Sequence, residues 1–451
     1  MWCVIPSLDL ILQGLAVVFT QPSCVTFQEI FTSWVMCLGR RTEFRVFEAF
    51  EGKAVSRKER HPFDRYYNFF SRSAWTVQDL ARQVAIQIVV ALNRVGELYL
   101  VVDGTLLHKS GKRVFALGWF YDAVRSTEKR SVTSPGNQWI VLGLAIRIPG
   151  TQRVFCLPIH AMLQQPGKNQ PGPADLARQM LTEALTWFPD RKFVLIGDGG
   201  FSAKNLLQNL DERVTYVGLM RGDASINDPQ SPVRRKGKTG PTPKCGPRLP
   251  SPREVAKKAD RAKGKTAKWR WKKINVSAYG ATRKFQVCAF QAVWPKVFGT
   301  RPILIVVCRG LEVGFGEVYL YTTHLDADLA WVVETYACRT SIEAAFKDSK
   351  QVMEIQKPQH WCEGSIRKLA PCVWLMQSLI TLWYLTEGQE LPEARAARKR
   401  LGPWETEWSL RHMLRLLRRE TLRTAINTIS PRKHDLQELI TSLENYLNLA
   451  A

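Results

Sequence analysis

Residues 97–220 constrain the fold more than any other part of the chain, because short apolar segments alternate there with amphipathic ones. β-Forming segments predict strands, and apolar residues three and four apart predict helices. In chain order we expect strands at Leu98–Val102, Val114–Tyr121 and Ile140–Ile148, a helix at Asp175–Phe188, a strand at Lys192–Ile196, a helix at Ser202–Leu210 and a strand at Thr215–Met220. This is an α/β order, which predicts a mixed sheet covered by helices.

The regions on either side of this segment have other patterns. Residues 1–95 have helical spacing, most clearly in Phe27–Leu38 and Val77–Leu92. From Asp326 onward the chain again favours helices. Between the two lie strand-like segments that predict a β insertion, at Ile274–Ser277, Lys284–Ala289, Pro302–Cys308 and Glu317–Tyr321. We therefore expect five parts: a helical DNA-binding region at 1–95, an α/β core at 96–222, a basic loop and β insertion at 223–322, a core helical part at 323–390 and a basic helical region at 391–451.

Two apolar stretches invite a membrane interpretation. Met1–Thr20 lacks a positive N-terminal region and carries Asp9, which argues against a signal peptide. Leu369–Leu385 is interrupted by Gln377 and Ser378 and is slightly short for a bilayer span. We predict that both stretches form buried helices.

The charge of the chain favours a polyanionic partner. The 64 Lys and Arg residues against 40 Asp and Glu leave a net charge of +24, and such an excess attracts nucleic acid, whose neutralised phosphates release counterions. Residues 234–273 alone carry +14 of this charge, with Pro and Gly scattered through them. We expect a mobile basic loop there. Anionic membranes and ribosome-like RNA are the rival partners.

Three segments combine cations with aromatic or apolar residues. Arg57–Pro62 is followed by Phe63–Arg72, and Lys268–Lys273 reads Lys-Trp-Arg-Trp-Lys-Lys; both patterns suit phosphate contact and stacking. The alternative for the first is a surface helix with a packed aromatic side. Trp408–Arg423 is a basic amphipathic helix, which either faces the core with a solvated side or contacts DNA.

The ten cysteines are dispersed singly, at positions 3, 24, 37, 156, 245, 288, 308, 338, 362 and 372. No Cys-x-x-Cys pair and no His-rich cluster accompanies them. A zinc knuckle is therefore not predicted, and a reducing, cytoplasmic compartment is expected.

Two aspartates follow apolar strands. Asp103 is expected to close the first strand, in Val-Val-Asp-Gly-Thr, and Asp198 the fourth, in Leu-Ile-Gly-Asp-Gly-Gly-Phe. Carboxylates at strand ends, with Gly beside them, lie where α/β sheets bind ligands. Either residue alone could be a helix N-cap or a turn residue; the two together favour a site.

The segment Leu325–Lys350 is predicted to be one helix with a polar stripe. Tyr336, Arg339, Glu343 and Lys350 fall at about 0°, −60°, −20° and −40° around its axis. A phenol, a guanidinium, a carboxylate and an ammonium on one stripe fit a metal-binding acid flanked by phosphate contacts. The alternative is an exposed face with helical ion pairs, since Arg339 and Glu343 are spaced i, i+4.

These residues resemble a known family. Tyr336, Arg339, Glu343 and Lys350 match the Y-x2-R-x3-E-x6-K signature of DDE transposases from bacterial insertion sequences. Asp103-Gly-Thr, Asp198-Gly-Gly-Phe and the segment Phe70–Trp75 resemble further family motifs, so the resemblance covers residues 60–385. Thr340 departs from the pattern, because relatives often carry Trp after the Arg.

The resemblance implies a ribonuclease-H-like core with a β-strand insertion between Asp198 and Glu343, which are 145 residues apart. Asp103, Asp198 and Glu343 would be the catalytic metal ligands. Mg²⁺, or Mn²⁺ in its place, is the expected cofactor, since both ions prefer oxygen ligands. The implied reaction is hydrolysis at the transposon ends followed by attack of the freed 3′-OH on target DNA.

The resemblance also implies the partners. Double-stranded DNA, as transposon ends and as target, would bind at least a dimer of the chain near the bacterial nucleoid, with no membrane involved. The expected DNA-binding residues are Tyr336, Arg339, Lys347, Lys350, Trp269, Arg270, Trp271, Lys272 and Lys273. Trp269, Trp271 and Trp294 are candidates for stacking on a flipped base, although Trp294 also fits core packing. A structure-specific nuclease and a catalytically inactive, transposase-derived DNA-binding protein remain the alternatives.

Overall fold

The computed structural model covers most of the chain, in ten stretches. The described residues are 5–51, 61–92, 95–127, 129–148, 153–230, 244–263, 267–278, 280–311, 316–400 and 409–429. Several features named from the sequence therefore lie outside them: Cys3, residues 57–60, residues 234–243 and 264–266 of the basic segment, Trp408, and residues 430–451 of the C-terminal region.

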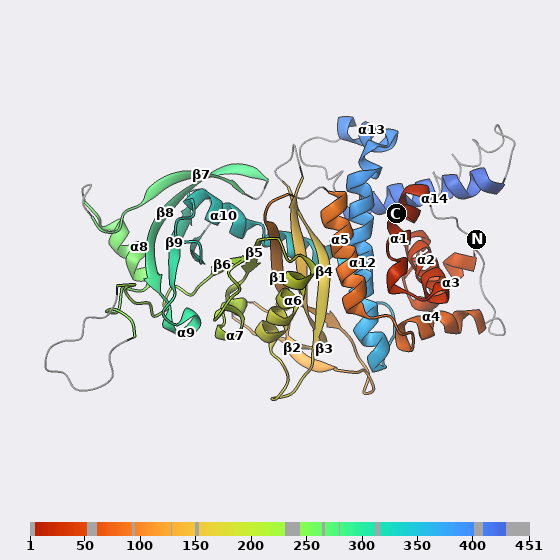
Figure 1. The fold of residues 1–451 in the computed structure, drawn as a ribbon, viewed down its shortest axis with the longest axis horizontal. Helices are drawn as coiled ribbons and strands as arrows, with labels where there is room; N and C mark the ends of the chain where they lie inside the picture. Colours follow the sequence, from red (N-terminus) through yellow and green to blue (C-terminus); the bar gives the residue numbers. More distant parts are fainter. Residues whose placement is uncertain are drawn as a thin grey trace.

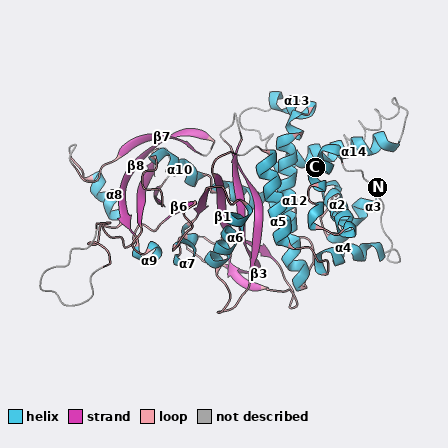
Figure 2. Cartoon of the chain, viewed as in Figure 1, coloured by secondary structure: helices cyan, strands magenta, loops and turns pink. Residues whose placement is uncertain are grey.

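One mixed sheet of ten strands runs through the molecule, with helices on both of its faces (Figures 1 and 2). The strands pair in the order β2-β3-β1-β5-β6-β10-β9-β8-β7, and β4 also pairs with β3. Their bounds are β1 Leu98–His108, β2 Gly118–Tyr121, β3 Thr133–Arg147, β4 Val154–Gln164, β5 Phe193–Gly197, β6 Val214–Leu219, β7 Lys272–Ala278, β8 Ala281–Val293, β9 Pro302–Gly310 and β10 Glu317–Thr322.

The central part of this sheet has the ribonuclease-H-like arrangement. In the order β4-β3-β1-β5-β6, strand β1 is parallel to β5 and β5 to β6, while β3 runs antiparallel to β1 and to β4. Helices cover both faces, as the α/β order predicted. The predicted fold class is confirmed.

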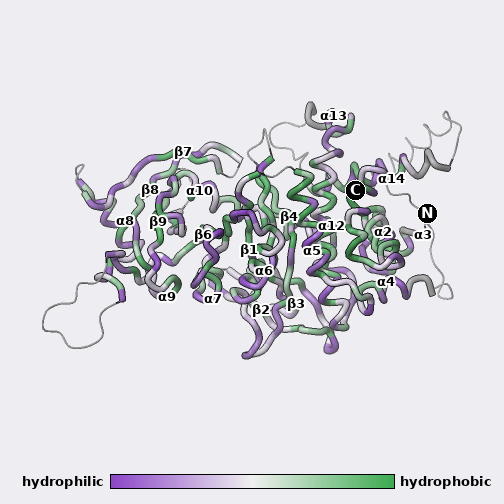
Figure 3. The backbone as a smooth tube through the Cα atoms, viewed as in Figure 1, coloured by the Kyte–Doolittle hydropathy of each residue, from purple (hydrophilic) through white to green (hydrophobic). Residues whose placement is uncertain are grey.

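The four strands after β6 continue the same sheet. Strand β10 pairs antiparallel with β6, and β9, β8 and β7 follow outward as a meander. The predicted β segments between Asp198 and Glu343 are thus strands, and they extend the core sheet instead of forming a separate one. The tube around β7 in Figure 3 is largely hydrophilic, which fits an outer strand.

Long helices enclose one end of the sheet. The helix α12 (Glu363–Thr386) is buried along its length and contacts β4, α4, α5 and α14. The other helices of at least eight residues are α1 Pro6–Gln13, α2 Gln21–Met36, α3 Glu43–Glu51, α4 His61–Ser71, α5 Val77–Ala91, α6 Pro173–Trp187, α8 Pro252–Asp260, α10 Leu329–Ala337, α11 Thr340–Gln351, α13 Pro392–Arg400 and α14 Leu410–Ile429.

Among the described helices, α12 is long and apolar enough to cross a membrane, but 89% of its most apolar window is buried inside the protein. The prediction of a buried helix at Leu369–Leu385 is therefore confirmed. In the first apolar stretch, α1 buries Leu8 and Leu12 but leaves Leu10 71% exposed.

The two faces of the core sheet are covered by different helices. His160 of β4, paired with Leu142, bonds to Glu183 of α6. Trp139 points to the opposite face, where it meets Trp374 of α12 edge to face at 5.6 Å. Asp103 is paired with Val141 and shares the face of Trp139, because side chains alternate along a strand. Helices α11 and α12 thus cover the face that carries Asp103.

The aromatic residues near the N-terminal cations pack inward. Tyr66, Phe69 and Phe70 of α4 are at most 1% exposed, and Trp75 stacks on Phe69 at 5.0 Å. The packed-side interpretation of this segment is correct for these rings, because neighbouring apolar helices offer them more burial than a DNA surface would.

Several expectations about elements were wrong. The strand β4 was missed because Pro158 interrupts its pattern; the structure absorbs this proline at a bulge opposite Leu142 and Gly143. Strand β2 is shorter than Val114–Tyr121, and the expected helix Ser202–Leu210 is only α7, Lys204–Leu207. In the supposedly mobile basic loop, α8 forms because Ser251 and Glu254 make a capping box and Val255 is fully buried.

The packing of α12 on the sheet predicts a large stability effect at Trp374. Its ring is 1% exposed and its Nε1 donates to Ser349 Oγ at 2.9 Å, so Trp374→Ala should lower the free energy of unfolding by about 3–5 kcal/mol. Trp119→Ala, at a ring that is 74% exposed, is the matched control and should change it by less than about 0.5 kcal/mol. Urea denaturation measures both; equal effects would contradict this packing.

Candidate active site

The register of β1 and β5 places two carboxylates side by side. The last residues paired between these parallel strands are Val102 and Gly197. Asp103 and Asp198 come next on the two strands, and neighbouring strands lie about 4.8 Å apart. The sequence predicted that Asp103 closes its strand. This was wrong, because β1 runs on to His108 along β3. Asp103 lies instead where the pairing with β5 ends.

Local backbone geometry fixes both aspartates. Asp103 Oδ1 accepts a hydrogen bond from Gly104 N at 2.7 Å. Asp198 caps the short 3-10 helix Gly199–Phe201, and its Oδ1 accepts from Gly200 N at 2.8 Å. Gly197 is required before it, because a Cβ there would lie 2.5 Å from Tyr216 Oη.

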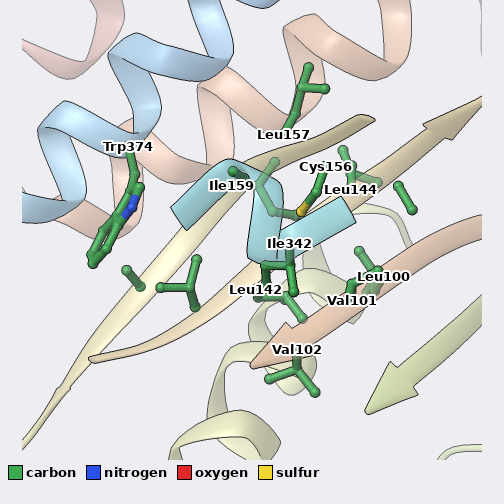
Figure 4. Close-up of a cluster of buried hydrophobic side chains, with 14 of the residues drawn as sticks. Leu100, Val101, Val102, Leu142, Leu144, Cys156, Leu157, Ile159, Ile342 and Trp374 are labelled. Carbon is green, nitrogen blue, oxygen red and sulfur yellow. The ribbon is translucent and has the colours of Figure 1, made fainter. Parts of the chain in front are cut away.

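The third carboxylate comes from α11. Glu343 lies in the first turn of this helix with its side chain 52% exposed. The preceding residue, Ile342, is fully buried against the sheet, close to the strand residues drawn in Figure 4. Ala345 and Phe346 are also buried. Burial of these three apolar side chains therefore holds Glu343 at the sheet face that carries Asp103.

The predicted single helix Leu325–Lys350 is divided. Helix α10 ends at Ala337 and α11 begins at Thr340, with i→i−3 backbone bonds from Cys338, Arg339, Ser341 and Ile342 between them. Arg339 keeps helical dihedrals, φ −55° and ψ −35°, so the chain tightens by part of a turn without changing course. The polar stripe therefore survives across the junction.

Arg339 lies between two of the three acids. Its Nη1 donates to Asp103 Oδ2 at 3.1 Å and its Nη2 bonds to Glu343 Oε1. The Arg339 side chain is 20% exposed and that of Asp103 16%. One guanidinium thus bridges the sheet and α11 at a largely buried position.

The electrostatics indicate that the charges of Asp198 and Glu343 both act on Asp103. Burial, helped by the negative charges of Asp198 and Glu343, raises the pKa of Asp103 to about 6, although Arg339 and the Gly104 N–H act in the opposite direction. Burial lowers the pKa of Arg339, but Glu343, Asp103, Tyr336 and Asp198 outweigh it and the net shift is upward. Asp103 is therefore a buried acid in a negative environment, which a cation stabilises.

This set of donors fits a hard divalent cation. It offers carboxylate oxygens alone, the ligands that Mg²⁺ and Mn²⁺ prefer. Across the described residues, no three His, Cys, Asp or Glu side chains are already gathered closely enough to enclose an ion. Between Asp103 and Glu343 the positive charge is that of Arg339, so a metal would have to displace or share this contact.

The remaining residues of the signature flank the acids. Tyr336 is half-buried on α10. Lys350 is half-buried at the other end of α11; burial lowers its pKa, while Asp122 opposes the shift. Lys347 is exposed on α11. The structure thus places cations along one side of the acids and a phenol on the other.

The tryptophans of the insertion have packing roles. Trp269 and Trp271 cover a small cluster around Val255 of α8. Lys258 and Lys268 approach the Trp269 ring at 5.1 and 5.2 Å, and Trp271 Nε1 donates to Asp260 at 2.9 Å. Arg270, Lys272 and Lys273 are exposed beside them. Trp294 packs against Tyr321 and Phe298 in the main core, as its alternative interpretation proposed.

Sequence reasoning missed a further cluster beside the site. His108, five residues beyond Asp103 on β1, bonds through Nε2 to Asp122 Oδ2 at 2.7 Å. Asp122 is 2% exposed and also accepts from the N–H groups of Val124 and Arg125. The signal was weak, because a lone His and a lone Asp 14 residues apart show no motif.

Comparisons with known proteins identify a family. The model of the family described as DDE superfamily endonuclease matches residues 27–280, which include Asp103 and Asp198 and end before Glu343. No curated protein matches the chain. Among solved structures, the cryo-EM structure of the piggyBac transposase synaptic complex with hairpin DNA is similar at 12% identity and a TM-score of 0.40, covering 96% of this chain and 81% of that one.

The raised pKa of Asp103 predicts a pH-dependent stability. The folded protein keeps the Asp103 proton up to pH about 6, whereas the unfolded chain releases it near 3.8. With metal chelated, the wild type should therefore lose about 3 kcal/mol of unfolding free energy relative to Asp103→Asn as the pH rises from 4 to above 6. Urea denaturation across this range measures the difference. Asp223→Asn, at an exposed ion pair, is the control, and a pH-independent difference would contradict the assignment.

Proposed function

Because this chain belongs to the DDE superfamily endonuclease family, we propose that it is a DNA transposase that moves an insertion sequence by a cut-and-paste route. The observation that supports the proposal is the contact of Arg339 with both Asp103 and Glu343, together with the effect of the charge of Asp198 on Asp103. A bacterial origin and a nucleoid location are part of the same proposal.

In this proposal the three carboxylates hold Mg²⁺, or Mn²⁺ in its place. Such ions activate a water or hydroxyl nucleophile and stabilise the leaving oxygen in an in-line displacement at phosphorus. Asp103 and Asp198 would hold their positions through the sheet register, and Glu343 through the buried side of α11. No covalent enzyme intermediate is required.

Arg339 would change partners when DNA binds. Without DNA it neutralises Asp103 and Glu343. With a phosphate present, its planar fork can bind two phosphate oxygens instead and leave the carboxylates to the metal. Tyr336 and Lys350 would hold neighbouring phosphates, with Lys347 on the exposed side of α11. The same contacts serve both steps: hydrolysis at the transposon end and attack of its 3′-OH on target DNA.

The positive charge would supply the wider DNA interface. The net charge of +24 favours double-stranded DNA, and Trp269, Arg270, Trp271, Lys272 and Lys273 form one candidate contact on the insertion. The helical regions 1–95 and 391–451 would contact DNA beyond the core residues 96–222 and 323–390. Cutting paired ends calls for a homodimer in the DNA complex.

The proposal predicts loss of activity at Glu343. Glu343→Gln keeps the helix but removes one ligand charge, so end cleavage and strand transfer with Mg²⁺ should fall at least about a hundredfold. The substrate is DNA that carries the gene's own flanks, and joined products separate a transposase from a nuclease. Glu363→Gln, on an exposed Glu of α12 with the same i, i+4 Arg pairing, should retain activity. Full strand transfer by Glu343→Gln would refute the site.

A second prediction concerns metal binding alone. Without Arg339 an added ion meets no internal competitor, so Arg339→Gln should bind Mn²⁺ about tenfold more tightly in the absence of DNA, in keeping with the strength of a charge-assisted hydrogen bond. Its affinity for DNA ends should fall. Isothermal titration with Mn²⁺ measures the first effect, and Arg367→Gln, whose partner is Glu363, is the control. Unchanged or weaker Mn²⁺ binding would contradict the displacement.

A further inference from the structure

Strand β2 carries two aromatic side chains that the protein leaves open to solvent. Trp119 is 74% exposed and Tyr121 is 59% exposed. Large rings gain free energy when they are covered, and their polar groups tolerate a wet partner. No feature of the proposed catalytic chemistry uses them. An exposed pair of this size on an edge strand marks an interaction surface.

Their spacing suits a nucleobase. Residues two apart on a strand share one face and lie about 6.8 Å apart. Bases stack at about 3.4 Å, so one base inserted between the two rings would be in contact with both.

The sheet register puts the pair on the face of the active site. Side chains that oppose each other across a ladder share a face, and the pairs form a regular series: Tyr121 with Thr133, Trp119 with Pro135, Leu107 with Asn137, Thr105 with Trp139 and Asp103 with Val141. From the level of Asp103 to that of Trp119, strand β3 advances by about 20 Å. A DNA strand covers that distance in about six nucleotides.

The positive charge of the residues near the pair in sequence favours a polyanionic ligand. The exposed charged side chains in the described part of residues 110–133 are cations: Lys112, Arg113, Arg125, Lys129 and Arg130. Asp122, an acid in the described part of this stretch, is buried and bonded to His108. Cations beside open rings are the combination that binds single strands, by backbone attraction and stacking.

The backbone under the pair is braced before any ligand arrives. Asn137 Nδ2 donates to the carbonyl oxygens of Phe115 and Ala116 at 3.0 and 3.1 Å. Phe115 N donates to Trp361 O at 2.8 Å, which ties the segment before β2 to the segment before α12. Binding would therefore order few additional groups, which favours affinity.

We propose that Trp119 and Tyr121 hold one unpaired DNA base between their rings, about six nucleotides from the phosphodiester that is cut. This rests on the proposed function and adds to it a second contact, specific for unpaired DNA. Stacking is tolerant of base identity, so the contact selects a distorted or opened duplex over a paired one without reading its sequence. A base within a paired duplex cannot enter the gap.

The test is a binding measurement in EDTA, which needs no cleavage. Fluorescence anisotropy compares the full-length protein on a short paired duplex and on the same duplex with one extra unpaired thymine. We expect the wild type to prefer the bulged duplex about tenfold or more, the contribution of one stacked base. Trp119→Ala/Tyr121→Ala should abolish the preference and leave paired-duplex binding within about twofold.

Controls distinguish the ring pair from other causes. Trp119→Phe/Tyr121→Phe should retain the preference, and so should Trp361→Ala, at another exposed ring. Equal binding of both duplexes by the wild type, or equal loss on both by the alanine variant, would overturn the proposal. So would a change in oligomeric state of the alanine variant on gel filtration, which would assign the rings to a contact between copies. Failure of cleavage by the wild type would instead count against the transposase proposal alone.

Discussion

The contact on which the site depends is the bridge from Arg339 to Asp103 and Glu343. The carboxylates of Asp103 and Glu343 would repel each other, and this repulsion would push α11 away from the sheet. The guanidinium compensates it from within the chain. The bridge costs side-chain freedom and desolvation of Arg339, yet removing either partner would leave an uncompensated buried charge. The folded chain is therefore already shaped around a cation.

The pairing of the strands fixes the position of Asp103 and therefore of the candidate cation site. Strand β1 pairs with β5 only as far as Val102 but continues along β3 to His108. Asp103 thus lies at the point where one neighbour ends and the other continues, which leaves its carboxylate a partly open side. The same continuation carries β3 on to β2, so one strand connects the acids with the exposed rings of Trp119 and Tyr121. The candidate acid Asp103 and the two exposed rings are therefore held by strands that pair with the same strand, β3.

Much of this could be predicted from the sequence, because the acids follow apolar β segments and the polar stripe has helical spacing. What failed depends on tertiary context. Pro158 hides β4, since its tolerance depends on a bulge in the partner strand. The division of α10 from α11 has no signal such as Gly or Pro. The exposure of Trp119 could not be predicted, because an apolar strand residue is indistinguishable from a buried one until the edge of the sheet is known.

Helix α12 connects these features through a small buried polar network. Gln377 Nε2 donates to Ala345 O at 3.1 Å, and Ser349 Oγ bonds to both Gln377 and Trp374. Satisfied polar contacts in a core fix one orientation, whereas apolar contacts tolerate sliding. The network therefore sets the rotation of α11 and with it the direction of Glu343. Just before this helix, the backbone oxygen of Trp361 accepts a hydrogen bond from Phe115 N, which precedes β2. A displacement of α12 would therefore affect both α11, which carries Glu343, and the segment that leads into β2.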